Sequence, residues 1–255
     1  MKKWIVVSLA IAIILMAAGC GGNAGQLSAI EPPNITGETP PAENAEHSIT
    51  GPPSEGNAAA PDIEQPAETE TPRILIAYFT WADNTVVEDP GAVDVDATTS
   101  ASVLAPGNAA KIADWIQQEV GGDLFSIVVE DPYSSDYDEC LDRAADEKAD
   151  DVRPALVNHV GNMENYDIVF IGFPNWWYTL PMAVLSFVDE YDFSGKTIVP
   201  FCTHGTGGLS STIRDLTAAL PDDVTILDAI GVYCPDVDSS RPAVQEWIAG
   251  LDLDI

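Results

Sequence analysis

Three short segments carry residue types that could hold a flat ring bearing a phosphate. Residues 80–85 bring hydroxyl and amide groups, which can donate hydrogen bonds to phosphate oxygens. Residues 174–178 place three aromatic side chains in a row, and such faces can flank a planar ring. Residues 203–208 contain three glycines, which let the backbone come close to a ring edge. Together the three segments predict one binding site.

Each segment also has a simpler interpretation. Residues 80–85 could be a plain connection between a strand and a helix. Trp176, Trp177 and Tyr178 could be core residues, although three neighbours on a turn cannot all face inward. The glycines of the third segment could serve only a flexible turn. His204 is equally a hydrogen-bonded structural histidine or a group beside the ring.

Five apolar runs predict the strands that must position these segments. They span residues 73–79, 124–129, 167–173, 197–202 and 224–232. Nearly continuous apolar character is typical of strands buried on both faces. Helical patterns alternate with them, at residues 111–120, 138–148, 183–188 and 213–220, with a last helix after residue 240. This alternation predicts an α/β fold with a doubly wound, five-stranded parallel sheet and right-handed crossovers.

The predicted fold places the three segments at one edge. They follow the first, third and fourth predicted strands, and ligands of such sheets bind beyond the carboxyl ends of the strands. Helix boundaries have their own signals. Pro181 suits a first helical turn, and Ser210 or Ser211 and Ser239 or Ser240 can cap the last two helices.

Residues 74–250 resemble the bacterial flavodoxin-like family, particularly members with a long insertion after the first strand. The matching stretches are Tyr78-Phe79-Thr80 with Asn84-Thr85, residues 96–102, Gly172-Phe-Pro-Asn-Trp-Trp177 with Pro181-Met-Ala183, and residues 193–205. The resemblance implies FMN as cofactor, the strand order 2-1-3-4-5, and one- or two-electron chemistry at the flavin.

The resemblance also implies how the phosphate is held. Thr80, Asn84 and Thr85 would donate to it, helped by a helix N-terminus. Asp83 stands where the family usually has Gly, so we expect its carboxylate to point away. Residues 107–109 look like the tail of the same motif, so the insertion at 86–106 would split the phosphate loop in two.

The full expected FMN site combines all three segments with this tail. Its residues are Thr80, Ala82, Asn84, Thr85, Gly107, Asn108, Ala109, Pro174, Asn175, Trp176, Trp177, Tyr178, Thr203, His204, Gly205, Gly207 and Gly208. Residues 96–102 form either a lid over the site or only an ordered insertion. No catalytic residue is assigned. No metal site is indicated, because the three histidines are scattered.

The first 19 residues predict a bacterial lipoprotein signal peptide. Lys2 and Lys3 precede an apolar run at residues 4–18, which is shorter than the roughly 20 residues of a membrane span. The run ends in Ala-Ala-Gly-Cys20, which resembles a lipobox, so Cys20 is expected to carry a lipid. An ordinary cleaved signal peptide or an uncleaved anchor is the alternative.

Residues 20–72 predict a lipidated cysteine followed by a disordered linker, and residues 73–255 form one domain. From residue 21 to 72 there is no Phe, Trp, Tyr, Lys or Arg, but there are nine prolines and nine acidic residues. Such a segment buries too little apolar surface to offset the entropy of ordering it. We therefore expect a domain tethered to the extracytoplasmic side of the cell membrane.

The chain is strongly acidic, with 41 acidic against 10 basic residues and a formal net charge of −31. This charge excludes nucleic acid as a natural partner and disfavours binding to anionic lipid surfaces. Membrane attachment is therefore expected through the lipid anchor only. An acidic surface suits a basic redox partner, which the charge alone does not identify.

Three cysteines remain beyond Cys20, namely Cys140, Cys202 and Cys234, without the CxxC spacing of redox or metal motifs. One disulfide is possible, but buried single thiols are favoured for at least two of them.

Three classes of function fit these observations. The first is an FMN-binding electron carrier, which we favour. The second is an FMN-dependent NAD(P)H reductase of quinones or similar acceptors. The third is a flavin-free scaffold or interaction protein, which the aromatic and glycine segments disfavour. Signatures of other enzymes are absent, including G-x-S-x-G, the P-loop and H-E-x-x-H.

Overall fold

The computed structural model describes residues 71–99, 102–253 and 255 of the chain. The predicted signal peptide, Cys20 and nearly all of the predicted linker lie outside these residues. Within them, no helix combines the length and apolar character that crossing a membrane requires.

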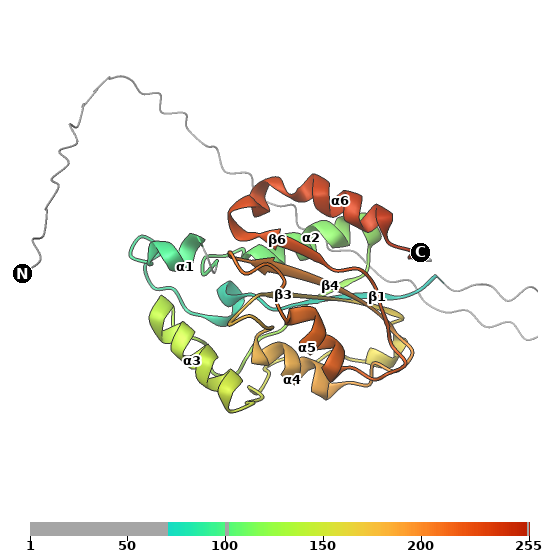
Figure 1. The fold of residues 1–255 in the computed structure, drawn as a ribbon, viewed down its shortest axis with the longest axis horizontal. Coiled ribbons are helices and arrows are strands. Elements are labelled where there is room, and N and C mark those ends of the chain that lie inside the picture. Colours follow the sequence, from blue (N-terminus) through green and yellow to red (C-terminus); the bar gives the residue numbers. More distant parts are fainter. Residues whose placement is uncertain (1–70, 100–101, 254) are drawn as a thin grey trace, which may run out of the picture. The chain divides into compact units, whose positions relative to one another are not determined.

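A parallel sheet runs through the middle of the domain (Figure 1). Its strands are β1 (Ile74–Tyr78), β2 (Asp123–Ser126), β3 (Ile168–Pro174), β4 (Thr197–His204), β5 (Thr225–Ile226) and β6 (Ile230–Tyr233). The order β2-β1-β3-β4-β5 confirms the predicted fold and strand order. β3 is buried along its whole length, as its continuous apolar sequence predicts.

The prediction of one last strand at 224–232 is wrong in detail. The segment forms two short strands, and both pair with β4: β5 beside its start and β6 beside its end. Asp228 lies between them, and its carbonyl accepts a hydrogen bond from the Trp247 indole at 2.8 Å. The apolar run hides this break, because the residues on both sides of Asp228 are apolar. The second strand also ends earlier than predicted, at Ser126.

Helices cover both faces of the sheet (Figure 1). α2 (Asn108–Val120) and α6 (Arg241–Gly250) pack on one face, and α3 (Tyr137–Ala149), α4 (Met182–Glu190) and α5 (Thr212–Ala219) lie on the other. The insertion contains a short helix, α1 (Val95–Thr99). The described residues also form three short 3₁₀ helices: η1 (Trp81–Asn84), η2 (Met163–Asn165) and η3 (Cys234–Ser239).

The expected serine caps occupy the right positions without capping. Ser211 and Ser240 are the N-cap residues of α5 and α6, but neither side chain bonds a helix N–H. Both have helical backbone angles rather than the extended angles of a capping residue. The Ser240 hydroxyl donates instead to the Val237 carbonyl of the preceding turn. Pro181 is the N-cap of α4, one position before its expected place.

The three cysteines of the described residues are free and buried, which confirms the expectation of single thiols. Burial raises the pKa of Cys140 and that of Cys202 to about 12. Both therefore stay protonated at neutral pH and act as small apolar core residues.

Candidate functional site

The loops that follow β3 and β4 are tied together at the carboxyl edge of the sheet. The Asn175 backbone N–H donates to the Thr203 carbonyl at 2.7 Å, and its side-chain amide donates to the Gly208 carbonyl at 2.6 Å. One asparagine therefore holds the aromatic segment against the glycine segment.

Between these loops lies a cavity of about 300 Å³, which we call the aromatic cavity. Its lining residues are Tyr137, Leu141, Pro174, Asn175, Trp176, Trp177, Tyr178, Thr203, His204, Gly205, Thr206 and Gly207. Nine of these residues are members of the expected ring site. Gly208 lies outside the lining, at positive φ, and offers its carbonyl to Asn175.

Two of the aromatic side chains project from an unusual tight turn. Trp176 and Thr179 exchange two backbone hydrogen bonds, of 2.9 and 3.0 Å. The two central residues, Trp177 and Tyr178, have φ of +50° and +67°. The two residues are 42% and 65% exposed. Such a turn normally contains Asn-Gly, so bulky aromatic residues here are a marked exception.

Trp176 faces the other way, into a cluster of aromatic rings. Its ring makes edge-on contacts with Phe79, Trp81 and Tyr133, at centroid distances of 5.4, 6.4 and 5.2 Å. The residue is half-buried and also lines the aromatic cavity. The core and ring-flanking interpretations therefore both apply to Trp176, whereas Trp177 and Tyr178 are surface residues beside the cavity.

The two expected parts of the phosphate loop lie against each other. A Cβ atom at Gly107 would lie 1.7 Å from Thr80 Oγ1 and 2.8 Å from Thr80 Cβ. The absence of a side chain at Gly107 therefore lets the start of α2 touch the end of β1. Asn108 begins α2, and the N-cap Gly107 provides no side chain to bond the helix N–H groups.

The structure gives Asn84 and Thr85 partners other than a phosphate. The Asn84 amide donates to the carbonyls of Thr80 and Ile127, at 2.8 and 3.0 Å, and its oxygen accepts from the Val129 N–H. Both amide hydrogens are thus already used. The Thr85 hydroxyl donates to the Tyr133 carbonyl at 2.8 Å. In this arrangement neither side chain can donate to a phosphate.

The remaining residues of the phosphate loop are mixed in character. Ala82 is half-buried, and Ala109 is buried in the core beside the sheet. Asp83 is exposed and accepts a hydrogen bond from the Ser126 hydroxyl at 2.6 Å. The Asn108 N–H donates to the Ser102 hydroxyl at 2.8 Å, which links the helix start to the insertion.

The described part of the insertion packs onto the domain. Ala97 and Val103 are buried, and the Val103 N–H donates to the Ala97 carbonyl. The pKa of Tyr137, in the lining of the aromatic cavity, is raised by burial and then by the charge of Asp96. These contacts describe an ordered insertion beside the cavity and are compatible with both interpretations of residues 96–102.

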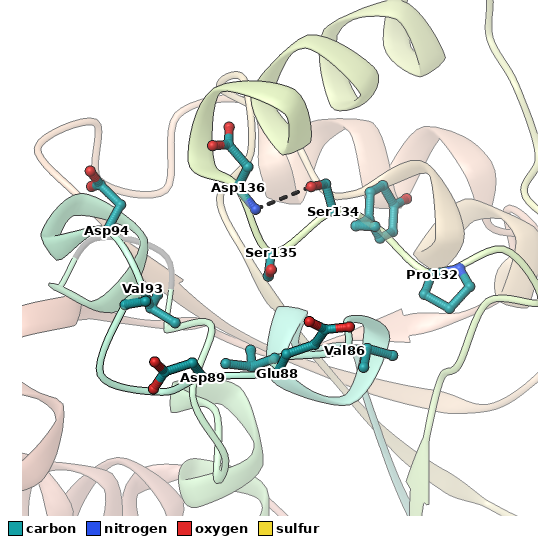
Figure 2. Close-up of a pocket in the computed structure, with 12 residues that line it drawn as sticks. Val86, Glu88, Asp89, Val93, Asp94, Pro132, Ser134, Ser135 and Asp136 are labelled. Atoms are coloured by element: carbon teal, nitrogen blue, oxygen red, sulfur yellow. Dashed lines mark hydrogen bonds between the residues drawn. The ribbon is translucent and has the colours of Figure 1, made fainter.

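A larger cavity, of about 730 Å³, lies between the insertion and the turn before α3 (Figure 2). Glu88 and Asp89 lie across it from Ser135 and Asp136 (Figure 2). Asp94 adds a further carboxylate. Phosphate would meet repulsion from these carboxylates, since like charges brought together cost several kcal/mol. This cavity is therefore a poor FMN site despite its size.

His204 is held by its own chain. Its Nδ1 lies 2.6 Å from the Gly205 carbonyl oxygen, so Nδ1 carries a proton. In the neutral ring, Nε2 is then an acceptor. Tyr137 and Leu141 were not expected in this site. They are four residues apart and therefore share one face of α3, a spacing that could have been noticed in the sequence.

Comparisons with known proteins agree with this architecture. A family model described as flavodoxin matches residues 97–249, and the chain belongs to this flavodoxin family. It is 28% identical to a candidate flavoprotein from Bacteroides eggerthii, with a TM-score of 0.52 over 69% of this chain and 96% of that one. Comparison with curated proteins found no match.

Two further solved structures illustrate the range of similarity. A candidate flavoprotein from Bacteroides uniformis is 26% identical, with a TM-score of 0.54 over 71% of this chain and 99% of that chain. A flavoprotein from Lactobacillus acidophilus, solved in complex with FMN, is 19% identical, with a TM-score of 0.47 over 66% of this chain and 98% of that chain.

Proposed function

We propose that this protein binds FMN at the carboxyl edge of its sheet and acts as an electron carrier at the extracytoplasmic face of the membrane. The observation that carries the proposal is the aromatic cavity, which lies beside the joined segments of Thr80 and Gly107 in a chain of the flavodoxin family. FMN, when bound, supplies one- or two-electron transfer.

The residues present fit a flavin ring. Small-molecule sites are typically about 300–1,000 Å³ and mostly apolar with a few polar groups, and the aromatic cavity matches this description. Nothing lies within 4 Å of where a Cβ at Gly205 would be, so the absent side chain leaves open space at the cavity wall. Trp177 and Tyr178 can cover a ring face from the surface side.

The residues also fit a phosphate, with a smaller set of ligands than the sequence predicts. The Thr80 hydroxyl and the N–H groups that follow Asn108 in the first turn of α2 would hold it, aided by the helix dipole, since the Asn108 N–H already donates to Ser102. Ring and phosphate positions are close together, because the side chains of Asn108, at the start of α2, and Thr203, beside the cavity, both lie near the Cys234 thiol and act to lower its pKa against the effect of burial.

The strong acidity of the chain favours a carrier over a reductase. About 300 Å³ lies at the lower end of the range for small-molecule sites, which suits one ring system. The strongly acidic surface suits a basic protein partner that collects or delivers electrons.

The visible spectrum of the purified protein tests this proposal. We expect a yellow protein, or one that becomes yellow with FMN at one flavin per chain. Chemical reductant should bleach the flavin, whereas NADH and NADPH should not. Rapid bleaching by either nucleotide would indicate a reductase. A colourless protein without FMN binding by calorimetry would indicate a scaffold.

The lipid anchor at Cys20 is a second testable part of the proposal. It is supported by the lipobox-like Ala-Ala-Gly-Cys20 and by the acidic charge, which leaves no electrostatic route to anionic lipid. A Cys20→Ala variant should leave the membrane fraction or accumulate unprocessed. A matched Cys140→Ala variant should stay in the membrane fraction. Membrane association of the processed Cys20→Ala protein would contradict the anchor.

A further inference from the structure

The Trp177–Tyr178 turn is held in its rare conformation by hydrogen bonds from outside it. Lys148 Nζ, on α3, donates to the Trp177 carbonyl at 2.6 Å, and the Trp177 indole donates to the Leu141 carbonyl at 2.9 Å. From the other side, the Ser211 N–H donates to the Tyr178 carbonyl at 3.1 Å. A strained backbone persists only where its surroundings over-determine it.

Lys148 differs from the other contacts because it brings a positive charge. It is exposed in the last turn of α3, where a cation is favoured by the helix dipole. Among the described residues it forms no ion pair within 4.0 Å. In a chain with 10 basic residues, this is a scarce charge beside the aromatic cavity.

Asp215, an acidic residue close enough to Lys148 to feel its charge, is held by further hydrogen bonds. Burial favours a higher pKa for Asp215, but hydrogen bonds from Thr179 and Arg214, together with the charges of Arg214 and Lys148, lower it. The Thr179 hydroxyl donates to the Asp215 carboxylate at 2.7 Å. Asp215 therefore remains ionised and anchors the far end of the turn, while Lys148 anchors its middle.

We propose that Lys148 is a positioning residue for the flavin site and raises the reduction potential of the bound flavin. Its ammonium fixes the Trp177 carbonyl, which sets where the two aromatic side chains stand. Its charge also favours a ring that has gained an electron over the oxidised, neutral ring. The inference rests on the proposed FMN site.

Three variants of the full-length protein separate the effect of the Lys148 hydrogen bond from the effect of its positive charge. Lys148→Met removes both, Lys148→Gln keeps a donor without charge, and Lys148→Arg keeps both. Arg241→Met is the matched control, since it removes one exposed cation on α6, where Arg241 bonds Gln118. Calorimetry gives the FMN dissociation constant, and redox titration against dyes gives the potential.

We expect Lys148→Met to bind oxidised FMN several-fold more weakly than wild type. The reduction potential of the bound flavin should also fall. If reduced FMN loses about tenfold more affinity than oxidised FMN, the fall is about 59 mV for a one-electron step. Lys148→Gln should show the same fall in potential with a smaller loss of oxidised affinity. Lys148→Arg should keep both the FMN affinity and the reduction potential close to those of wild type. Arg241→Met should match wild type in both measurements.

A purely structural role would lower the melting temperature or weaken both redox states equally, with no change in potential. That result, or an equal fall in potential in Arg241→Met, would overturn the inference. Failure of the wild-type protein to bind FMN would instead contradict the proposed function. Because Lys148 is exposed, all three variants are expected to fold.

Discussion

Replacing Gly107 with alanine is expected to weaken FMN binding at least tenfold and to lower the free energy of unfolding by about 1–3 kcal/mol. The added Cβ would lie 1.7 Å from Thr80 Oγ1 and 2.8 Å from Thr80 Cβ. Rotation of the Thr80 side chain relieves the first clash but not the second, so the start of α2 must move away from β1. Calorimetry with FMN and urea denaturation measure the two effects.

The matched control is Gly161→Ala, since a Cβ there has no neighbour within 4 Å. Its stability should stay within about 0.5 kcal/mol of wild type, with unchanged FMN affinity. If Gly107→Ala is destabilised as expected but binds FMN like wild type, α2 and β1 do not form one phosphate cradle. The phosphate would then have to lie elsewhere on the carboxyl edge.

The parts of the fold that sequence predicts well are those decided by burial. β3 is the clearest case, because a strand covered on both faces must be apolar throughout and β3 is buried at every residue. For residues 224–232 the apolar composition predicts one continuous strand, because composition does not report where strand pairing stops. At the break, the Trp247 indole of α6 donates to the Asp228 carbonyl, a contact between distant segments that composition does not reveal.

The site divides in a similar way. Trp177 and Gly205 both line the aromatic cavity, and the sequence predicts them together because an aromatic side chain offers a flat apolar face and a glycine allows close approach of the backbone. The role of Asn84 could not be assigned, because an amide bonds a backbone carbonyl as readily as a phosphate. Its acceptor at Ile127 lies 43 positions away and is brought near only by the tertiary fold.

The sequence does not reveal the contact between Lys148 and the Trp177 turn, for a related reason. The sequence of α3 is that of an acidic, solvated helix, and one lysine near its end indicates no more than a favourable interaction with the helix dipole. The ammonium group of Lys148 bonds the backbone carbonyl of Trp177, and every residue type has such a carbonyl, so the sequence at position 177 does not indicate the contact. Contacts between a side chain and a distant backbone atom are therefore the least visible part of such a site.

Replacing Trp177 with alanine is expected to lower FMN affinity several-fold to about tenfold while changing the free energy of unfolding by no more than about 1 kcal/mol. The residue is 42% exposed, so little apolar contact with the protein is lost. The change also removes the hydrogen bond to the Leu141 carbonyl, which has a net value of about 1 kcal/mol. The flavin spectrum should shift, because one face of the ring loses its aromatic neighbour.

Trp176→Ala should give the opposite balance, because this ring packs edge-on against Phe79, Trp81 and Tyr133. We expect a loss of about 3 kcal/mol in the free energy of unfolding, together with weaker FMN binding.

Trp115→Ala, on α2 and packed against the other face of the sheet, should lower stability with little effect on the flavin. Calorimetry, urea denaturation and the flavin spectrum of all three variants separate the two roles. If both Trp177→Ala and the Trp176→Ala/Trp177→Ala double variant melt earlier but keep the affinity and spectrum of wild type, these tryptophans only stabilise the fold. The ring would then have to stack on Tyr178 or bind outside the aromatic cavity.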